Sequence, residues 1–295
     1  MSELSETAAR PGQARATGIG LVAIMLWAAL ALLTVHANGI PSFELLSLTF
    51  GVAFLAGLAA LAMGGRERLA ELRQPAAPWL TAFVGIFLYH ALYFFALSAA
   101  PAAQASLIAY LWPLLIVLLS TLAAGQRLRL PHLIGAVLGL AGTFSLFLGK
   151  NTEAASAGAA MGYLAAFGCA FVWSGYSVAN RKYGATPSGM LVGVCGAIAV
   201  AGAICHLVFE TTIAPNGGQW LAIVALGLGP TGLAFFAWDH ATKHGNLPLL
   251  GALSYLAPLV STLLLILTGQ AESSLAIIVA ALLIIGGAAI AAKAA

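Results

Sequence analysis

Charged residues are scarce in this chain. Only 7% of its 295 residues are Asp, Glu, Lys or Arg, whereas 61% are hydrophobic and the mean hydropathy is +1.00. A soluble domain carries about a quarter charged residues, so this chain has too little charge to cover a surface in water. The shortage excludes a cytosolic enzyme and a nucleic-acid-binding protein, and it predicts an integral membrane protein surrounded by the lipid bilayer.

Cysteine is nearly as scarce. The three cysteines, Cys169, Cys195 and Cys205, all lie inside apolar runs, a position typical of small buried hydrophobic side chains. This pattern excludes a disulfide-stapled secreted module. No metal site and no cofactor are expected.

Ten long apolar runs divide the chain, and about 20 apolar residues suffice for one membrane-spanning helix. No segment alternates apolar and polar residues as the strands of a membrane barrel do, so the fold class predicted is all-α with ten transmembrane helices. The first run is longer than the roughly 7 to 15 apolar residues of a signal peptide and is expected to be a span. The predicted spans are Thr17–His36, Phe43–Met63, Trp79–Ala99, Ala102–Ala124, Leu130–Leu148, Gly158–Asn180, Pro187–Phe209, Gln219–Trp238, Leu247–Thr268 and Leu275–Ala292.

The distribution of positive charge predicts the orientation, because Lys and Arg are retained on the cytoplasmic side during insertion. With the N-terminus inside, eleven of the twelve Lys and Arg residues fall on the cytoplasmic side, and only Lys150 falls outside. Both termini are therefore expected in the cytoplasm.

The chain contains an internal repeat. Residues 105–114, ASLIAYLWPL, reappear as residues 250–259, LGALSYLAPL, and Trp27 in the first span matches Trp173 in the sixth at nearly the same offset. Five spans per half is an odd number, so the two halves are expected to lie inverted in the membrane, an arrangement that suits alternating access. The predicted parts are a cytoplasmic tail 1–16, a first five-helix repeat 17–150, a linker 151–157 and a second five-helix repeat 158–295.

The signature Ala-Ser-x-x-x-x-Leu-x-Pro at residues 105–113, together with the ten spans in two inverted halves, resembles the drug/metabolite transporter superfamily in its EamA-type ten-helix branch. The aromatic middle helices are similar to those of bacterial aromatic amino-acid exporters. The resemblance implies an exporter in the bacterial inner membrane whose substrates are small molecules, most of all aromatic amino acids. Exporters of other neutral amino acids or metabolites share the same ten-helix arrangement, so these substrates are the alternative. Because a duplicated chain contains both halves of its pathway, a monomer is expected.

Polar and amphipathic side chains in the middle of the spans point to a substrate site, since they must face protein or water. His90 lies near the centre of the third span, and Tyr89 and Tyr93 beside it share one helix face. Each residue alone also fits a role in helix packing. As a set from five spans, the candidates are expected to line a central cavity: Trp27, Tyr89, His90, Tyr93, Tyr110, Trp112, Trp173, Tyr176, Ser254 and Tyr255.

Two prolines occupy equivalent places in the repeat. Pro113 and Pro258 each lack a backbone donor and clash with the carbonyl four residues earlier, which would free the carbonyls of Ala109 and Ser254. Both prolines are expected to act as hinges.

The predicted spans contain no Lys or Arg, and Glu44 and Asp239 fall at span edges where solvation is expected. A phosphorylated substrate would lack a countercharge, so a neutral or zwitterionic substrate is expected; a cationic aromatic drug, held by ring quadrupoles, is the alternative. His90 is the sole candidate for a proton relay at mid-depth. We expect facilitated transport, with proton coupling as the alternative.

Two other classes of protein remain for comparison. An intramembrane enzyme would need a nucleophile with a base, or metal ligands, and the chain has neither Gly-x-Ser-x-Gly nor His-Glu-x-x-His. A channel would be open to both faces at once, so saturable counterflow would distinguish a carrier from it. The sequence favours a carrier.

Overall fold

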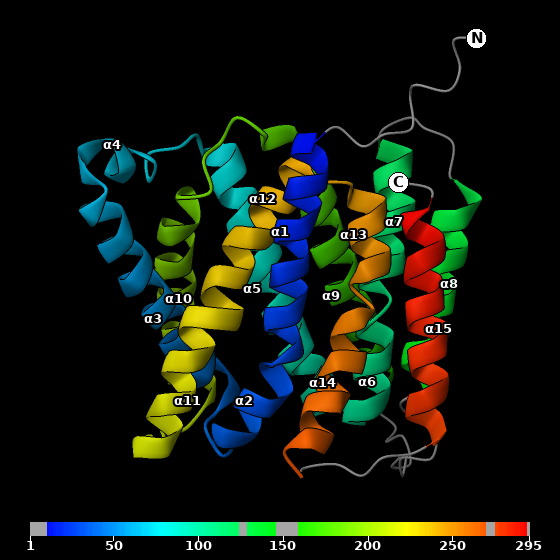
Figure 1. The fold of residues 1–295 in the computed structure, drawn as a ribbon. Coiled ribbons are helices and arrows are strands. Elements are labelled where there is room, and N and C mark those ends of the chain that lie inside the picture. Colours follow the sequence, from blue (N-terminus) through cyan, green and yellow to red (C-terminus); the bar gives the residue numbers. More distant parts are fainter. Residues whose placement is uncertain (1–10, 124–128, 146–158, 270–274, 294–295) are drawn as a thin grey trace.

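The computed structural model describes residues 11–123, 129–145, 159–269 and 275–293, and all regular structure within these ranges is helical (Figure 1). The predicted linker 151–157, Lys150 and the facing ends of the fifth and sixth spans lie outside the described residues. The helices are α1 Pro11–Ala28, α2 Leu30–His36, α3 Ser42–Met63, α4 Gly65–Ala70, α5 Ala76–Ala99, α6 Ala102–Ala109, α7 Trp112–Ala123, α8 Leu130–Ser145, α9 Ala159–Ala179, η1 Asn180–Tyr183, α10 Met190–Phe209, α11 Gly217–Leu228, η2 Gly229–Leu233, α12 Ala234–His244, α13 Leu247–Leu253, α14 Leu256–Leu267 and α15 Leu275–Ala292.

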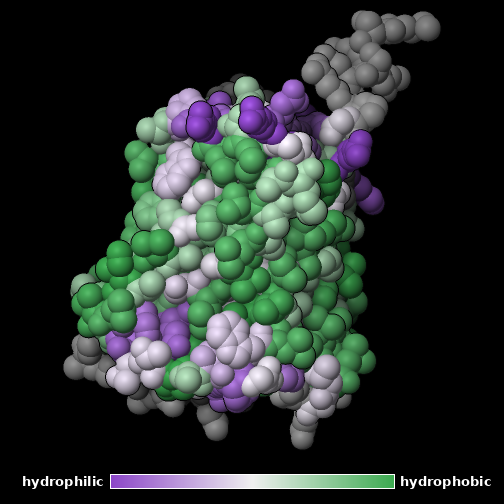
Figure 2. Space-filling model, turned by 90° about the vertical axis from the view of Figure 1, so that its left-hand side faces the viewer, coloured by the Kyte–Doolittle hydropathy of each residue, from purple (hydrophilic) through white to green (hydrophobic). Residues whose placement is uncertain are grey.

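Within the described ranges, seven helical stretches are long and apolar enough to cross a membrane, and two shorter apolar helices accompany them. Figure 2 shows a broad hydrophobic band between two hydrophilic ends, the distribution expected of a surface in lipid. The seven are Gly12–His36, Ser42–Met63, Ala76–Ala99, Gln104–Ala123, Met190–Phe209, Gly217–His244 and Leu247–Leu267, and the shorter two are Leu130–Ser145 and Leu275–Ala291.

Two of these stretches are interrupted just before a proline. α6 ends at Ala109 and α7 begins at Trp112, while α13 ends at Leu253 and α14 begins at Leu256. Pro113 and Pro258 therefore lie in the first turns of α7 and α14, where backbone N–H groups have no partner within the helix and a missing donor costs little. The carbonyl of Ser254, which was expected to be free, accepts from the backbone N–H of Ala257 at 3.1 Å, and the role of the two prolines as hinges stays a prediction.

A third interruption has the form of a short π-helix, η2, which connects α11 to α12. Pro230 lies near its start, and the hydroxyl of Thr231 donates to the carbonyl of Leu226 at 2.9 Å. The indole N–H of Trp27 on α1 donates to the carbonyl of Pro230 at 3.1 Å. Single π-turns inside α-helices occur often at functional sites, and this one brings α1 against α12.

The two halves of the sequence pack mainly against each other. α1 packs against α12, α3 against α10, α5 against α9, and α8 against α15. The α8–α15 contact is the closest: a side-chain carbon built on Gly135 would lie 2.5 Å from the carbonyl oxygen of Gly287, and one built on Gly287 would lie 2.6 Å from that of Gly135. Small residues allow such backbone approach between membrane helices.

Three expectations about helix ends are wrong. The first helix already includes residues 11–16, which were expected to belong to the cytoplasmic tail before Thr17. The eighth predicted span continues past Trp238 to His244, so it carries Lys243 inside it, and Asp239 is fully buried (0% exposed). Glu44 is also buried, at 7% exposure, rather than solvated. Each of these charged side chains has a partner that removes the cost of burial.

Candidate functional site

Five aromatic rings from four helices meet in the middle of the molecule. We call Trp27, Trp112, Trp173, Phe235 and Trp238 the aromatic cluster. The Trp27 ring lies 5.2 Å from Trp238, 5.5 Å from Trp173, 5.8 Å from Phe235 and 6.4 Å from Trp112, measured between ring centroids. Most of these pairs are edge-to-face, the geometry that ring quadrupoles favour. Trp27 and Trp173 each contact all the other rings of the cluster.

The aromatic cluster lies where the two halves of the sequence meet. α1 and α7 of the first half contribute Trp27 and Trp112, and α9 and α12 of the second half contribute the other three rings. Trp238 is fully buried, Trp112, Trp173 and Phe235 are nearly so, and Trp27 is half-buried. A motion of one half relative to the other would therefore open or close this cluster.

α5 supplies a second set of rings beside the aromatic cluster. Tyr89 lies 5.5 Å from Trp173 and stacks on Tyr93 at 6.0 Å. His90 approaches Phe235 at 6.2 Å and Phe50 on α3 at 5.6 Å. All three candidates on α5 are half-buried. The stacked rings of Tyr89 and Tyr93 fit one shared helix face, and the place of these residues in a substrate site stays a prediction.

The imidazole of His90 has one fixed partner. Its Nδ1 lies 2.8 Å from the carbonyl oxygen of Ile86, one turn earlier on the same helix. In the neutral tautomer that donates this bond, Nε2 is an acceptor. The ring can then receive a hydrogen bond from a ligand N–H without taking up a proton.

Polar side chains of α6 contact Tyr93 on α5 and Tyr163 on α9. The Tyr93 hydroxyl and the Ser106 hydroxyl on α6 are 3.0 Å apart, and Tyr163 donates to the side-chain oxygen of Gln104. Tyr110 lies in the gap between α6 and α7, and its backbone N–H donates to the carbonyl of Ser106 at 3.0 Å. Hydroxyl and amide groups of this kind fix the orientation of a ligand in an otherwise apolar site.

The remaining candidates lie at the edge of this site or outside it. Tyr176 contacts Trp173 at 5.4 Å and packs against Gly85 of α5. The Ser254 hydroxyl donates to the carbonyl of Leu250 at 2.7 Å. Tyr255 is fully buried and packs on α8 in a separate hydrophobic cluster with α15. The structure does not bring Ser254 and Tyr255 to the aromatic cluster.

Sequence reasoning missed Phe235 and Trp238. Both precede Asp239, and the polar residues that follow were taken as the end of the span. The signal was present, because Asp239 and Lys243 are four residues apart and pair across one helical turn, with a carboxylate oxygen 2.7 Å from the ammonium nitrogen. A helix that continues through this pair places Trp238 well inside the molecule.

A buried polar network adjoins the aromatic cluster around this ion pair. Asp239 accepts from the side-chain amide of Asn180 at 2.9 Å and from the hydroxyl of Ser188 at 2.5 Å, and Lys243 donates to the carbonyl of Thr186 at 2.9 Å. Next to it, the Trp238 indole N–H donates to the Ser177 hydroxyl at 3.1 Å. These bonds fasten α12 to the end of α9 and to the segment that precedes α10.

The rings and polar groups around the aromatic cluster can bind a ligand. The described residues contain no group of three or more His, Cys, Asp or Glu side chains that could hold a metal ion. Flat ring faces, one imidazole and several hydroxyls can enclose a flat side chain and hydrogen-bond to its polar end.

Comparison with known proteins gives consistent results. The EamA-like transporter family matches residues 16–148 and again residues 160–292. A protein from Ancylobacter novellus named aromatic amino acid exporter YddG is 48% identical over 281 residues, which cover 94% of this chain and 96% of the relative. A protein of the same name from Salmonella typhimurium is 27% identical over 264 residues, with 85% and 87% covered. One solved crystal structure, 46% identical, superposes with a TM-score of 0.90 over 95% of this chain and 97% of that chain.

Proposed function

This chain belongs to the EamA-like transporter family, whose matches span nearly all of it, and from that premise we propose that it carries aromatic amino acids out of the bacterial cytoplasm by alternating access. It is a transporter and not an intramembrane enzyme. The relatives named aromatic amino acid exporters cover most of its length and support the substrate class.

The observation that carries the substrate assignment is the aromatic cluster at the contact between the halves. Trp27 contacts Trp112 from its own half and Trp173 from the other, so a substrate bound here would touch both halves. Aromatic rings offer stacking faces to a flat side chain. The half-buried Tyr89 and His90 would bind its polar end.

We infer ten membrane crossings in two inverted halves. The seven long apolar stretches, the two shorter ones and α9 together make ten. In such a repeat the first span corresponds to the sixth and the third to the eighth. When each span is exchanged for its counterpart, the contact of α5 with α9 becomes the contact of α12 with α1. The contacts of α3 with α10 and of α8 with α15 each join a span to its own counterpart.

The same correspondence extends to the helix breaks. Tyr110 in the gap before α7 matches Tyr255 in the gap before α14, and Pro113 matches Pro258. Hinges at the two prolines would bend one half toward one face and the other half toward the opposite face, as alternating access requires. The two separate family matches support halves close to residues 17–150 and 158–295.

The chain would lie in the inner membrane with both termini in the cytoplasm and would work as a monomer. The positive-inside distribution of Lys and Arg supports this orientation. In Figure 1 the start of α1 and the end of α15 lie at the same end of the molecule as α4, whose sequence contains Arg66 and Arg68.

Release from cells tests the function. Bacteria preloaded with labelled phenylalanine should release it faster when they express the wild-type chain than when they express the Trp112→Ala variant. Labelled glutamate should be retained equally by both. Equal release of phenylalanine by both strains, with both proteins present in the membrane, would contradict the proposal.

The transport is proposed to be facilitated. Uptake into proteoliposomes should occur without any ion gradient, because the carboxylate beside the aromatic cluster, that of Asp239, is already paired with Lys243 and His90 is bonded to a backbone carbonyl. An imposed pH gradient should not drive accumulation. Uptake that needs the pH gradient and is lost in His90→Gln would instead make His90 a proton-coupling residue.

A further inference from the structure

The π-helix η2 is the joint inside one long membrane-spanning stretch, residues 217–244. Figure 1 shows the two parts of this stretch, α11 and α12, beside α2 and α1. Ala234 is the first residue after η2, the next residue is Phe235 of the aromatic cluster, and Trp238 follows one turn later. The orientation of these two rings therefore depends on how η2 ends.

The residues of η2 explain its irregular form. In an α-helix the carbonyl of Leu226 would accept from the backbone N–H four residues later, but that residue is Pro230, which has none. The hydroxyl of Thr231 donates to this carbonyl instead, at 2.9 Å. Leu226 and Thr231 are both buried, so an unpaired carbonyl here would be costly. Gly232 is needed as well, because a side-chain carbon built on it would collide with the carbonyl oxygen of Gly227.

The altered hydrogen bonding of η2 gives the other half of the chain an acceptor. The backbone N–H of Ala234 donates to the carbonyl of Gly229, five residues earlier, whereas in an α-helix it would donate to that of Pro230. The carbonyl of Pro230 accepts from the indole N–H of Trp27 on α1, at 3.1 Å. Because Trp27 contacts all the other rings of the aromatic cluster, η2 fixes a third ring of the five.

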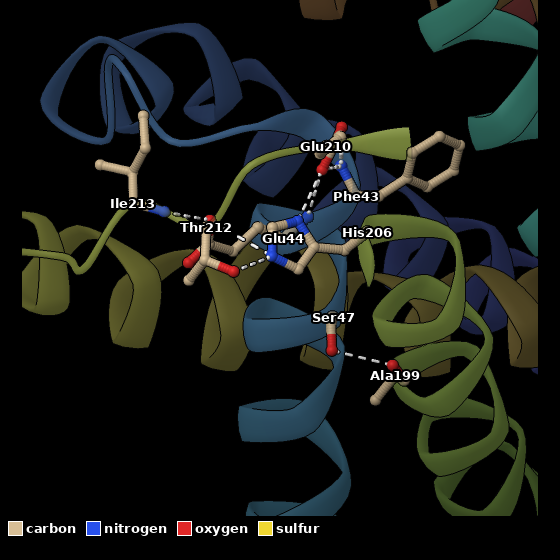
Figure 3. Close-up of polar contacts among 8 residues, drawn as sticks. All are labelled: Phe43, Glu44, Ser47, Ala199, His206, Glu210, Thr212 and Ile213. Carbon is tan, nitrogen blue, oxygen red and sulfur yellow. Dashed lines mark hydrogen bonds and ion pairs between the residues drawn. The ribbon is translucent and has the colours of Figure 1, made fainter. Parts of the chain in front are cut away.

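Both helices that η2 joins are held in place away from the joint. The segment before α11 is fastened to α3, because the backbone N–H of Ile213 donates to a carboxylate oxygen of Glu44 at 3.0 Å (Figure 3). On the other side of η2, Asp239 of α12 accepts from Asn180 at 2.9 Å and from Ser188 at 2.5 Å. A change in the hydrogen bonds of η2 would therefore be taken up between these points, where the aromatic cluster lies.

Conversion of η2 into a regular α-helix would have a large geometric effect. A π-turn contains one residue more than an α-turn, and one residue corresponds to about 100° around a helix. The side chains at the start of α12 would turn away from Trp27, and the carbonyl of Pro230 would return to the N–H of Ala234. The indole of Trp27 would then lose its acceptor.

We propose that Thr231 is a positioning residue for the substrate site, an inference that rests on the proposed function. Its hydroxyl replaces the donor that Pro230 lacks, maintains η2, and so holds Trp27, Phe235 and Trp238 in the arrangement that binds an aromatic side chain. Without the hydroxyl, the carbonyl of Leu226 is unpaired in this arrangement, so the protein adopts it less often. The apparent affinity for substrate falls with the population of the binding-competent state.

Counterflow of labelled tryptophan in proteoliposomes tests this role with two variants of one side chain. Thr231→Val removes the hydroxyl and should raise the concentration for half-maximal rate at least about fivefold, the lower end of the effect of an unpaired buried carbonyl. The maximal rate should stay close to that of the wild type, because saturating substrate restores the binding-competent state. Thr231→Ser retains the hydroxyl and should restore the wild-type half-saturation.

Thr121→Val on α7 is the matched control. Thr121 and Thr231 are equally buried, at 8% exposure, and the Thr121 hydroxyl donates to the carbonyl of Val117 at 2.8 Å. That carbonyl belongs to a regular helix, where the backbone N–H of Thr121 is its donor, so removal of the hydroxyl leaves it paired. Thr121→Val should keep the wild-type half-saturation. An equal rise in both valine variants, or no rise in Thr231→Val, would overturn the proposal.

The indole proton of Trp27 provides a measurement that is independent of transport. In NMR spectra of isotope-labelled protein in detergent, its resonance, assigned with Trp27→Phe, should exchange with water more slowly than that of Trp220, whose ring is exposed. Thr231→Val should accelerate this exchange, and Thr231→Ser should not. Fast exchange in the wild type would overturn the proposal even if Thr231→Val does not fold. Slow exchange in a wild-type protein without saturable tryptophan transport would instead contradict the proposed function.

Discussion

At the scale of residues, the aromatic cluster offers ring faces from both halves of the chain. Trp112 lies 6.2 Å from Trp173 across the contact, and both rings are largely buried. A buried tryptophan contributes to packing as well as to recognition, so the two roles must be separated by experiment.

Replacing either ring should reduce transport more than it reduces folded protein. Trp112→Ala or Trp173→Ala removes a stacking contribution of about 0.5 to 1.5 kcal/mol beyond area burial, equivalent to a loss of about 2- to 12-fold in counterflow of aromatic amino acids. Counterflow in proteoliposomes, normalised to monodisperse protein, measures this loss. Trp220→Ala, at an exposed ring on α11, serves as the control and should keep full activity. Full activity in both cluster variants would remove these rings from the site.

The buried ion pair of Asp239 and Lys243 should matter for stability. Asp239→Asn leaves a buried ammonium without its countercharge, which costs about 3 to 5 kcal/mol and should lower the melting temperature in detergent. Glu71→Gln breaks the more exposed pair with Arg68 and should cost no more than about 1 kcal/mol. The double variant Asp239→Asn/Lys243→Met should be more stable than Asp239→Asn alone. Equal melting temperatures of Asp239→Asn and Glu71→Gln would show that the buried ion pair contributes no more to stability than the more exposed one.

The aromatic residues of the proposed site could be predicted from the sequence, whereas the surroundings of the charged residues could not. Trp27, Trp112 and Trp173 stood out because aromatic side chains at mid-span are rare enough to be noticed. Glu44 was taken as solvated because its partners, His206 and Ile213, lie far along the chain. Long-range pairing of this kind leaves no local pattern.

At the scale of elements, α8 and α15 form the closest contact between the halves. The backbones at Gly135 and Gly287 approach each other so nearly that a methyl group on either would meet the carbonyl oxygen of the other. Each glycine therefore sets the distance between its helix and the partner helix.

An added methyl group at this contact should push the helices apart. Gly135→Ala should cost about 1 to 3 kcal/mol, as overpacking does, and should lower the melting temperature. Gly286→Ala places the same methyl on the neighbouring residue of α15 where nothing lies within 4 Å, and should be neutral or slightly stabilising, since alanine favours helix by up to about 1 kcal/mol. The same melting temperature for both variants would contradict the close contact.

Helix positions were predictable because lipid demands long apolar runs, and the breaks before Pro113 and Pro258 were predictable because proline restricts the helix. The π-helix at Gly229–Leu233 was not predicted. It accepts a hydrogen bond from Trp27, a residue of another helix, and such a long-range contact leaves no local pattern. The end of α12 was placed too early for a different reason: the charged side chains of Asp239 and Lys243 were interpreted as a loop, although their spacing of four residues lets them pair within the helix.

At the scale of the whole molecule, the proposed orientation in the membrane rests on the sequence pattern that would place eleven of the twelve Lys and Arg residues on the cytoplasmic side. In a variant without native cysteines, a cysteine introduced at Gln74 or Gly184 should react with a membrane-impermeant reagent only after the cells are opened. Cysteines introduced at Asn38 or Asn151 should react in intact cells. Reaction at Gln74 in intact cells would invert or break the proposed topology.

Counterflow by the purified wild-type protein tests the central proposal most directly. Proteoliposomes loaded with unlabelled tryptophan, with no ion gradient, should take up labelled tryptophan at a rate that saturates with external concentration and is competed by phenylalanine and tyrosine but not by glutamate or lysine. Such exchange requires a site for aromatic amino acids that faces each side in turn. A rate that rises linearly with concentration, or that glutamate and lysine inhibit as strongly as phenylalanine, would contradict an aromatic amino-acid carrier.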